Sequence, residues 1–278
     1  MAKKTEGKIL VNGSVVIDTI LEKEFFGGTG ANISYGLGKL KTSPLLFSLA
    51  GEDFKKDYGA HLKKSGVILR VHIEKMKRTA SFSLINNEGE KQIWILKRNA
   101  YKNINKISLT KTISENELKK ISIAIFSPGT PDSILKHMRE FRNHSPKATV
   151  IFDPGQEINN FSKKILEKCA SFCDIFIVNE NEYAQAKKIL KQDPTKVFNK
   201  KIIIKTLGEK GSIIFQDKKI TKVPAVHPKK VVDTTGAGDA YRAGLIFGLW
   251  KGFSLTKSCT LGAKMAAINI EHLGCQKY

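Results

Sequence analysis

In the stretch from Val231 to Gly244, VVDTTGAGDAYRAG, Gly236 and Gly238 stand directly before the acid Asp239 and the start of an apolar run. Gly236 and Gly238 can adopt backbone conformations closed to other residues, so that successive N–H groups converge on one point. If residues 237–250 are helical, that point lies at the positive end of the helix, which favours an anion. The stretch, with Asp239 in the first turn, is therefore either an ordinary helix start or a phosphate-binding loop.

Two common phosphate-binding motifs are missing from the sequence. No Walker loop is present, and no GxGxxG follows the first expected strand. If the protein handles nucleotides, it must hold their phosphates with another loop.

The charge balance is strongly basic, with 47 Lys and Arg against 26 Asp and Glu and a net charge of +21. Basic surfaces attract phosphate backbones, so nucleic-acid binding is one interpretation. Only six of the basic residues are Arg, and the lysines are spread along the whole chain. We interpret the charge as a lysine-rich solvated surface and expect no nucleic-acid partner.

The apolar runs are short. Ala243 to Trp250 is among the longest and falls far below the roughly 20 residues of a membrane-spanning helix, so we expect no membrane partner. The first residues carry lysines but no apolar signal region, which favours a cytoplasmic protein. The four cysteines form no CxxC pair, and no His stands at metal-ligand spacing, which argues against a zinc site.

Strand-like runs alternate with amphipathic segments in the second half of the chain. Continuous apolar runs, typical of parallel strands buried on both faces, occupy 121–128, 148–154, 174–180 and 201–208. Segments of helical period occupy 132–142, 161–170 and 180–190. This order predicts an α/β protein with a doubly wound, mostly parallel sheet flanked by helices. Polar or small residues end each run, so we expect the site at the carboxyl ends of the strands.

Two segments, 8–25 and 79–97, instead alternate apolar with polar residues. The second contains Asn86 to Glu90 as a turn and predicts a hairpin with one solvated face. We expect these segments to form a small β lid beside the main sheet. With no repeat or linker in the sequence, we expect a single domain over 1–278.

DTTGAGDAYRAG resembles, almost letter for letter, the C-terminal signature of the ribokinase-like (PfkB) carbohydrate and nucleoside kinases. Further blocks are similar to that family in its order: 26–32 to the GGxxxN motif, 48–67 to the next block, 179–182 to NxxE and 206–211 to the nucleotide loop. The resemblance covers nearly the whole chain. It implies a ribokinase-like fold and an ATP-dependent kinase that uses Mg²⁺.

The resemblance also implies roles for individual residues. Asp239 would be the general base that takes the proton from a substrate hydroxyl as it attacks the γ-phosphate. The amides from Gly236 to Asp239, with Ala237 and Gly238 between them, would form an anion hole for the transferring group. Substrate binding would fall to three residues of the N-terminal half: Asp18, Gly28 and Asn32.

The remaining matches concern ATP and its ions. Asn179 and Glu182 would organise Mg²⁺, with Glu182 acting through water, although the same pair also reads as a helix capping box. Thr206, Gly208 and Gly211 would line the ATP phosphates and ribose. Two further residues, Asp233 and Thr235, match positions that in many relatives help to bind a monovalent cation such as K⁺.

Two stretches bear on the substrate. FDPGQE (152–157) and INIEHLGCQKY (268–278) resemble the bacterial and archaeal adenosine or nucleoside kinase branch. The resemblance favours phosphorylation of a primary hydroxyl of a nucleoside such as adenosine. The alternatives are a ribokinase or other sugar kinase and a non-catalytic nucleoside or sugar sensor, against which the intact Asp239 argues.

The sequence departs from the family in one place. Only eight residues separate Asp18 from Gly27, where relatives usually carry a longer β-excursion that forms much of the lid. The lid is therefore expected to be shortened. Either the 79–97 hairpin covers the sugar alone, or a partner subunit in a homodimer supplies cover. Because a closed lid excludes water, a smaller lid predicts more ATP hydrolysis without substrate.

Overall fold

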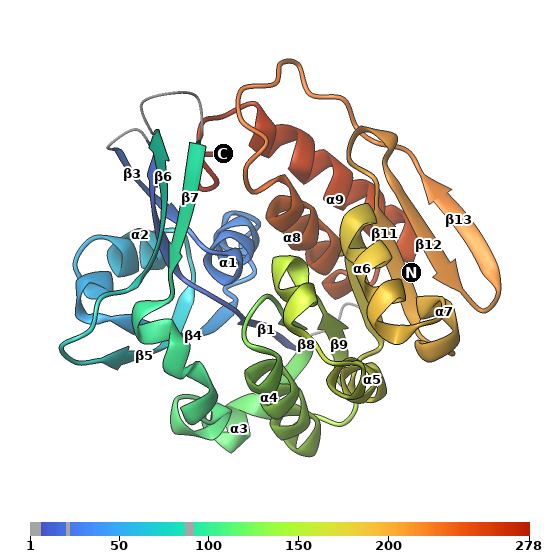
Figure 1. Cartoon of the computed structure of the whole chain (residues 1–278), viewed down its shortest axis with the longest axis horizontal. Helices are drawn as coiled ribbons and strands as arrows, with labels where there is room; N and C mark the ends of the chain where they lie inside the picture. Colours follow the sequence, from blue (N-terminus) through green and yellow to red (C-terminus); the bar gives the residue numbers. More distant parts are fainter. Residues whose placement is uncertain (1–6, 21–22, 87–91) are drawn as a thin grey trace.

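A nine-stranded sheet runs through the molecule with helices on both faces (Figure 1). The computed structural model describes residues 7–20, 23–86 and 92–278. The strands of this sheet are β1 (Lys8–Asn12), β4 (Leu45–Gly51), β5 (Ile68–Glu74), β8 (Ile121–Phe126), β9 (Thr149–Phe152), β10 (Ile175–Asn179), β11 (Ile202–Thr206), β12 (Ser212–Gln216) and β13 (Lys219–Val223). Their spatial order is β13-β12-β11-β10-β9-β8-β1-β4-β5.

Neighbouring strands from β11 to β5 pair in parallel, and β12 and β13 add an antiparallel edge. The central strands are apolar on both faces because alternate residues enter two different cores. Val11 and Ile125 belong to one core, whereas Leu10 and Ala124 belong to the other. The predicted α/β class with a mostly parallel, doubly wound sheet is confirmed.

The helices divide between the two faces of the sheet. One core contains side chains of α1 (Thr29–Lys39), α2 (Tyr58–Lys64), α8 (Ala237–Trp250) and α9 (Leu255–Ile270). The other contains side chains of α3 (Glu115–Leu118), α4 (Pro131–His144), α5 (Lys163–Phe172), α6 (Glu180–Leu190) and α7 (Pro194–Val197). Short 3₁₀ turns occupy 52–55, 99–106, 109–111, 155–160 and 208–210. Within the described ranges, none of these helices has the length and apolar character needed to cross a membrane.

A second, four-stranded sheet consists of β2 (Val16–Ile20), β3 (Lys23–Gly27), β6 (Ala80–Asn86) and β7 (Gln92–Lys97) in the order β3-β2-β6-β7. The predicted range 8–25 for the first lid segment is wrong at its start. Residues 8–12 form β1 of the large sheet, because their apolar side chains are buried from both sides. The turn predicted over Asn86 to Glu90 lies largely outside the described residues.

The small sheet is built from two antiparallel strand pairs, β2 with β3 and β6 with β7. β2 pairs with β3 on one side and with β6 on the other, so the 79–97 hairpin does not form this sheet alone. The pair of β2 and β3 therefore forms half of the small sheet. The expectation of a single domain over 1–278 stays a prediction.

Candidate active site

The predicted functional residues meet at the carboxyl edge of the large sheet. The chain leaves β1 for β4 on one side and later returns to place β8 on the other, which makes a topological switch point between β1 and β8. Ligands of open α/β sheets bind outside the strands at such a point. The start of α8 reaches this edge, because Arg242 in its second turn binds Asp153 directly after β9.

The start of α8 leaves backbone N–H groups available to a ligand. Gly236 precedes the helix in the left-handed conformation, with φ 78°, and no described side chain caps the helix. A Cβ at Gly236 would lie 2.8 Å from Sγ of Cys275, so the position requires glycine. The N–H of Ala237 donates to the carbonyl of Thr234 at 3.2 Å. The next two N–H groups, of Gly238 and Asp239, have no acceptor in the described part of the chain and can receive an anion.

Asp239 lies half-buried in the first turn of α8, where Nδ2 of Asn32 donates to its Oδ2 at 2.8 Å. Desolvation raises the pKa of Asp239 to about 7 against the opposing effects of Asn32 and Arg242, and the nearby carboxylates of Asp153 and Glu182 raise it further. A carboxyl group that titrates near neutral pH is suited to accept a proton in catalysis.

Asp18 faces Asp239 from β2 of the small sheet. Desolvation raises the pKa of Asp18 to about 7, and the charge of Asp239 contributes to the shift. The charge of Asp239 therefore opposes the ionisation of Asp18.

Gly28 and Asn32 lie where β3 passes into α1. Gly28 has φ 92°, and a Cβ there would lie 2.7 Å from the backbone N of Val16, so only glycine fits between the small sheet and the helix. Asn32 is buried, with 4% of its surface exposed, and its amide is turned toward Asp239. The structure thus brings Asp18, Gly28 and Asn32 to one place, with Asn32 directly bonded to the predicted base.

Asn179 and Glu182 form the capping box that the sequence allowed. Oδ1 of Asn179 accepts from the N–H of Glu182, Oε2 of Glu182 accepts from the N–H of Asn179, and both distances are 2.8 Å. Desolvation and the nearby Asp153 raise the pKa of Glu182. No group of three His, Cys, Asp or Glu side chains in the described ranges could hold a metal ion. This donor set fits a Mg²⁺ held through water and phosphate oxygens better than one bound directly.

A cavity of about 580 Å³ opens beside the start of α8. Thr206, Gly208 and Gly211 line it together with Ala237 and Gly238, so the predicted nucleotide residues and the predicted anion hole share one space. Its other walls are largely apolar, with Val226, Ala263, Ala266, Ala267 and Ile270. Apolar walls beside free amides suit a ligand with a flat ring at one end and phosphates at the other.

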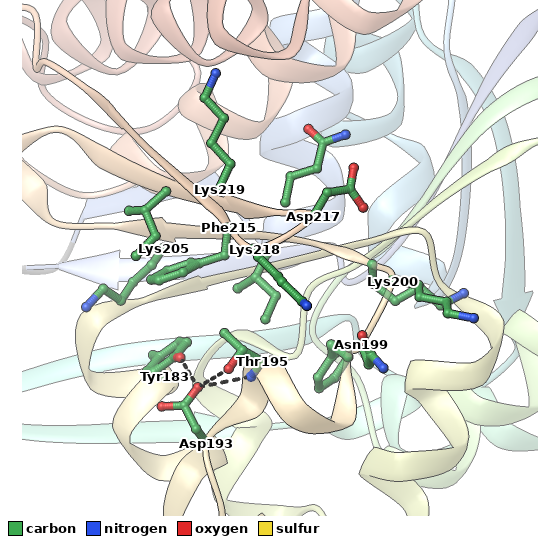
Figure 2. Close-up of a pocket in the computed structure, with 15 residues that line it drawn as sticks. Tyr183, Asp193, Thr195, Asn199, Lys200, Lys205, Phe215, Asp217, Lys218 and Lys219 are labelled. Atoms are coloured by element: carbon green, nitrogen blue, oxygen red, sulfur yellow. Dashed lines mark hydrogen bonds between the residues drawn. The ribbon is translucent and has the colours of Figure 1, made fainter.

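A second cavity of about 580 Å³ lies toward the other end of β11, between the β12–β13 hairpin and α7 (Figure 2). It is lined by five lysines, Lys200, Lys201, Lys205, Lys218 and Lys219. Asp193 is engaged there by the hydroxyls of Tyr183 at 2.8 Å and Thr195 at 2.7 Å, and it caps α7. None of the predicted site residues lines this cavity, which makes the cavity beside α8 the candidate nucleotide site.

The pattern that describes the pfkB family of carbohydrate kinases matches residues 9–278. The chain belongs to this pfkB family. The nucleoside kinase of Methanocaldococcus jannaschii is 28% identical over 257 residues, which cover 91% of this chain and 82% of that protein. The crystal structure of the nucleoside kinase from this archaeon, an archaeal member of the ribokinase family, superposes with a TM-score of 0.88 at 26% identity and covers 98% of this chain and 94% of that one.

This pfkB-family kinase also resembles a solved structure that contains a bound ligand. The nucleoside kinase of Burkholderia thailandensis in complex with inosine has a TM-score of 0.86 at 25% identity and covers 97% of this chain and 93% of that one. The predicted ribokinase-like fold and the predicted kinase activity are both confirmed by these comparisons.

Asp233 and Thr235 of this pfkB-family kinase lie in the turn before α8. Oδ1 of Asp233 accepts from the N–H of Thr235 at 2.9 Å, and its Oδ2 accepts from the N–H of Gly274 at 3.0 Å. Partial burial opposes ionisation, but these hydrogen bonds lower the pKa of Asp233 overall. A charged carboxylate in this turn is compatible with a cation, and the cation role stays a prediction.

Sequence reasoning missed several residues that hold the kinase site together. Arg242 forms a buried ion pair with Asp153, with Nη2 to Oδ1 at 2.7 Å, and its Nη1 donates to the carbonyl of Gly238 at 3.0 Å. The pair ties the first turn of α8 to the end of β9. Two features of the sequence hint at this ion pair. Arg242 stands three residues after Asp239, and Asp153 is the acid of DPGQ, which served only as a marker of the branch. Gln276 lies in the ending INIEHLGCQKY, which served only as a marker of the branch, and Tyr58 carried no local signal.

Proposed function

We propose that this ATP-dependent kinase phosphorylates nucleosides at a primary hydroxyl of the ribose. The observation that carries the proposal is the position of Asp239. It lies in the first turn of a helix with free amides, directly after Gly238 of the cavity beside α8, and close enough to Asp18 to raise the pKa of that carboxyl group. A base, an anion hole and a polar group for substrate hydroxyls thus lie together.

The chain's own residues support a direct phosphoryl transfer. Asp239 takes the proton from the substrate hydroxyl while the oxygen bonds to the γ-phosphorus and the bond to the leaving diphosphate breaks. The N–H groups of Gly238 and Asp239, at the positive end of α8, stabilise the charge on the transferring group. ATP supplies that group, and a Mg²⁺ held through water near Asn179 and Glu182 would neutralise part of the charge on its phosphates. The products are ADP and the phosphorylated substrate, and Asp239 returns its proton to water.

A small hollow lies on the side of the small sheet where a base could follow the ribose. About 50 Å³ in volume, it lies under the small sheet, and its lining includes Val16, Ala80 and Gln156. Val16 and Asp18 point to the same face of β2, because side chains alternate along a strand. A substrate that extends from Asp239 past Asp18 therefore reaches the hollow, where the exposed Gln156 amide can bind a base. The hollow must widen for a whole base, so the small sheet has to move when a nucleoside binds.

The test is a panel of acceptors assayed for ADP release with ATP and Mg²⁺, with and without K⁺. Adenosine, guanosine, inosine and cytidine represent nucleosides, and ribose, fructose and 2-keto-3-deoxygluconate represent sugars. We expect a nucleoside to be preferred and some ADP release without acceptor, as the short lid predicts. A preference for ribose would assign the protein to the sugar kinases, and acceptor binding without ADP release would make it a sensor. Negligible hydrolysis without acceptor would contradict the expectation from the short lid.

Three further expectations belong to this proposal. The four cysteines are free thiols, which fits the proposed cytoplasmic location. Activation by K⁺ through Asp233 and Thr235 is tested by the K⁺ arm of the panel. Two predictions remain: that the protein forms a homodimer, which light scattering would test, and that it does not bind nucleic acid, which titration with DNA would test.

A further inference from the structure

Residues 274–278 pack against the active site from the side of α1 and α2. The N–H of Gly274 bonds Asp233, Cys275 lies against Gly236, and the hydroxyl of Tyr35 donates to the carbonyl of Tyr278. Gln276 lies at the centre of this segment with only 5% of its surface exposed. The segment therefore contacts both the turn before α8 and the helix that carries Asn32.

Gln276 is the middle member of a hydrogen-bonded chain that ends on the base. Its Nε2 donates to Oδ1 of Asn32 at 2.8 Å and to the hydroxyl of Tyr58 at 2.8 Å. Tyr58 donates in turn to the carbonyl of Gly27, the last residue of β3. At the other end, Nδ2 of Asn32 donates to Asp239 at 2.8 Å.

The direction of every hydrogen bond in this chain is determined by its two ends. The carbonyl of Gly27 can only accept, so the Tyr58 hydroxyl must donate to it and accept from Gln276. The ionised Asp239 carboxylate, the form that acts as base, also only accepts, so Asn32 must present Nδ2 to it and Oδ1 to Gln276. Gln276 lies between two acceptors, Oδ1 of Asn32 and the hydroxyl of Tyr58, and must donate a hydrogen to each. The amide nitrogen of Gln276 supplies both.

The bond from Asn32 lowers the pKa of Asp239, which desolvation and neighbouring acids otherwise raise. If the Asn32 amide turned over, its oxygen would meet the carboxylate and two acceptors would face each other. The hydrogen bond that Asn32 accepts from Gln276 opposes this rotation, because the turned amide would also place two donors together.

We infer that Gln276 is a positioning residue for the catalytic base: it holds the Asn32 amide in the orientation that donates to Asp239. The inference rests on the proposed function for its effect on catalysis. Its structural part concerns the ionisation of Asp239 and can be measured without substrate. Asn32 accordingly has two roles: it donates a hydrogen bond to the base Asp239, and it is predicted to contact the substrate.

The test compares the pKa of Asp239 in the unchanged protein and in Gln276→Met, which keeps the shape of the side chain and removes its donors. The pKa is read from the ¹³C shift of the Asp239 carboxyl, assigned by its loss in Asp239→Asn. The charged or titratable groups that face Asp239 stay unchanged in this comparison: Asp18, Tyr58, Asp153, Glu182, Arg242, Cys275 and Tyr278.

We expect Gln276→Met to raise the pKa of Asp239 by about one unit, and the acidic limb of kcat/KM to move with it. Activity at pH 6 should then fall about tenfold and recover at high pH. Asn32→Leu should give the same shift, and the double variant should add nothing further, because both changes remove one hydrogen bond. If Gln276→Met does not fold, Gln276→Asn, whose amide is one methylene too short for both partners, replaces it.

Asn12→Leu is the matched control. It removes a buried amide that bonds His137 at 3.0 Å and has no bond to Asp239, so it should lower the melting temperature without moving the pKa. A Gln276 variant that behaves like this control would overturn the inference, as would additive shifts from Gln276 and Asn32. If Asp239→Asn kept full activity, the proposed function would fail, but the carboxyl titration would still decide the role of Gln276.

Discussion

Two helices begin at the carboxyl edge of the sheet in opposite ways. α6 begins with a complete capping box, in which Asn179 and Glu182 satisfy each other's backbone N–H groups. α8 begins with Gly236 in the left-handed conformation and without a cap from any described side chain. Both helices carry an acid in the first turn, yet only α8 leaves amides open beside a cavity.

The difference shows how a helix start is made either structural or functional. At α6 the carboxylate of Glu182 folds back on its own backbone. At α8 the carboxylate of Asp239 is held by Asn32 from a different helix, so it does not occupy its own amides. An anion therefore finds free donors at α8 and occupied ones at α6.

The largest expected effect comes from Asp239→Asn, which removes the base of α8. We expect kcat to fall by about 10² to 10⁴, the usual contribution of general base catalysis, while ATP binding measured by calorimetry is kept. Asp132→Asn is the control, because Asp132 also lies in the first turn of a helix but in α4. Full activity of Asp239→Asn would show that α8 supplies no base.

Gly236→Ala tests the free amides at the same helix. The new Cβ would collide with Cys275, and the left-handed backbone conformation costs about 1 to 2 kcal/mol for a residue other than glycine. The start of α8 should therefore shift. We expect kcat/KM to fall about 10- to 100-fold, because a misplaced donor or reacting group has effects of this size. Gly252→Ala carries the same strain just beyond the other end of α8, at φ 74°, and should cost stability alone. Equal losses of activity in both variants would contradict a special role for the start of α8.

The pH dependence of kcat/KM should follow the ionisation of Asp239, and Asp18 titrates in the same pH range. Because the base must be ionised, activity should rise with pH and reach half of its plateau near pH 7. The sign for stability is opposite: the folded state holds these protons more tightly than the unfolded state, so the free energy of unfolding should fall as pH rises from about 4 to about 7. Thermal melts of the native protein and of Asp239→Asn over this range measure the second effect. A profile flat between pH 5.5 and 8 would be inconsistent with the raised pKa of Asp239.

The smallest effect is expected at α6. Asn179→Ala should lower the free energy of unfolding by about 1 kcal/mol through loss of the cap. Ser162→Ala removes the cap of α5, away from the site, and should cost a similar amount. Only Asn179→Ala should also change the Mg²⁺ concentration needed for half-maximal activity, since it frees Glu182 from the box. Identical Mg²⁺ curves for the two variants would leave the Asn179 pair a purely structural cap.

Much of the architecture followed from local sequence pattern. The continuous apolar runs at 121–128 and 174–180 became β8 and β10, because a strand covered by helices on both faces needs no polar side. The start of α8 could be placed from the glycines of GAGD, since few other residues tolerate that conformation. Alternation misled at residues 8–12, where the pattern of a half-exposed strand did not show that both faces are covered.

The sequence by itself determined the fold class, the family and the position of Asp239, because each depends on residue types at short, regular spacing. Only the tertiary structure decided that Asn32, Tyr58 and Gln276 join in one hydrogen-bonded chain to the base, and that Arg242 pairs with Asp153. These partners lie up to 244 positions apart in the chain, and their pairing depends on burial and donor geometry that no local pattern encodes.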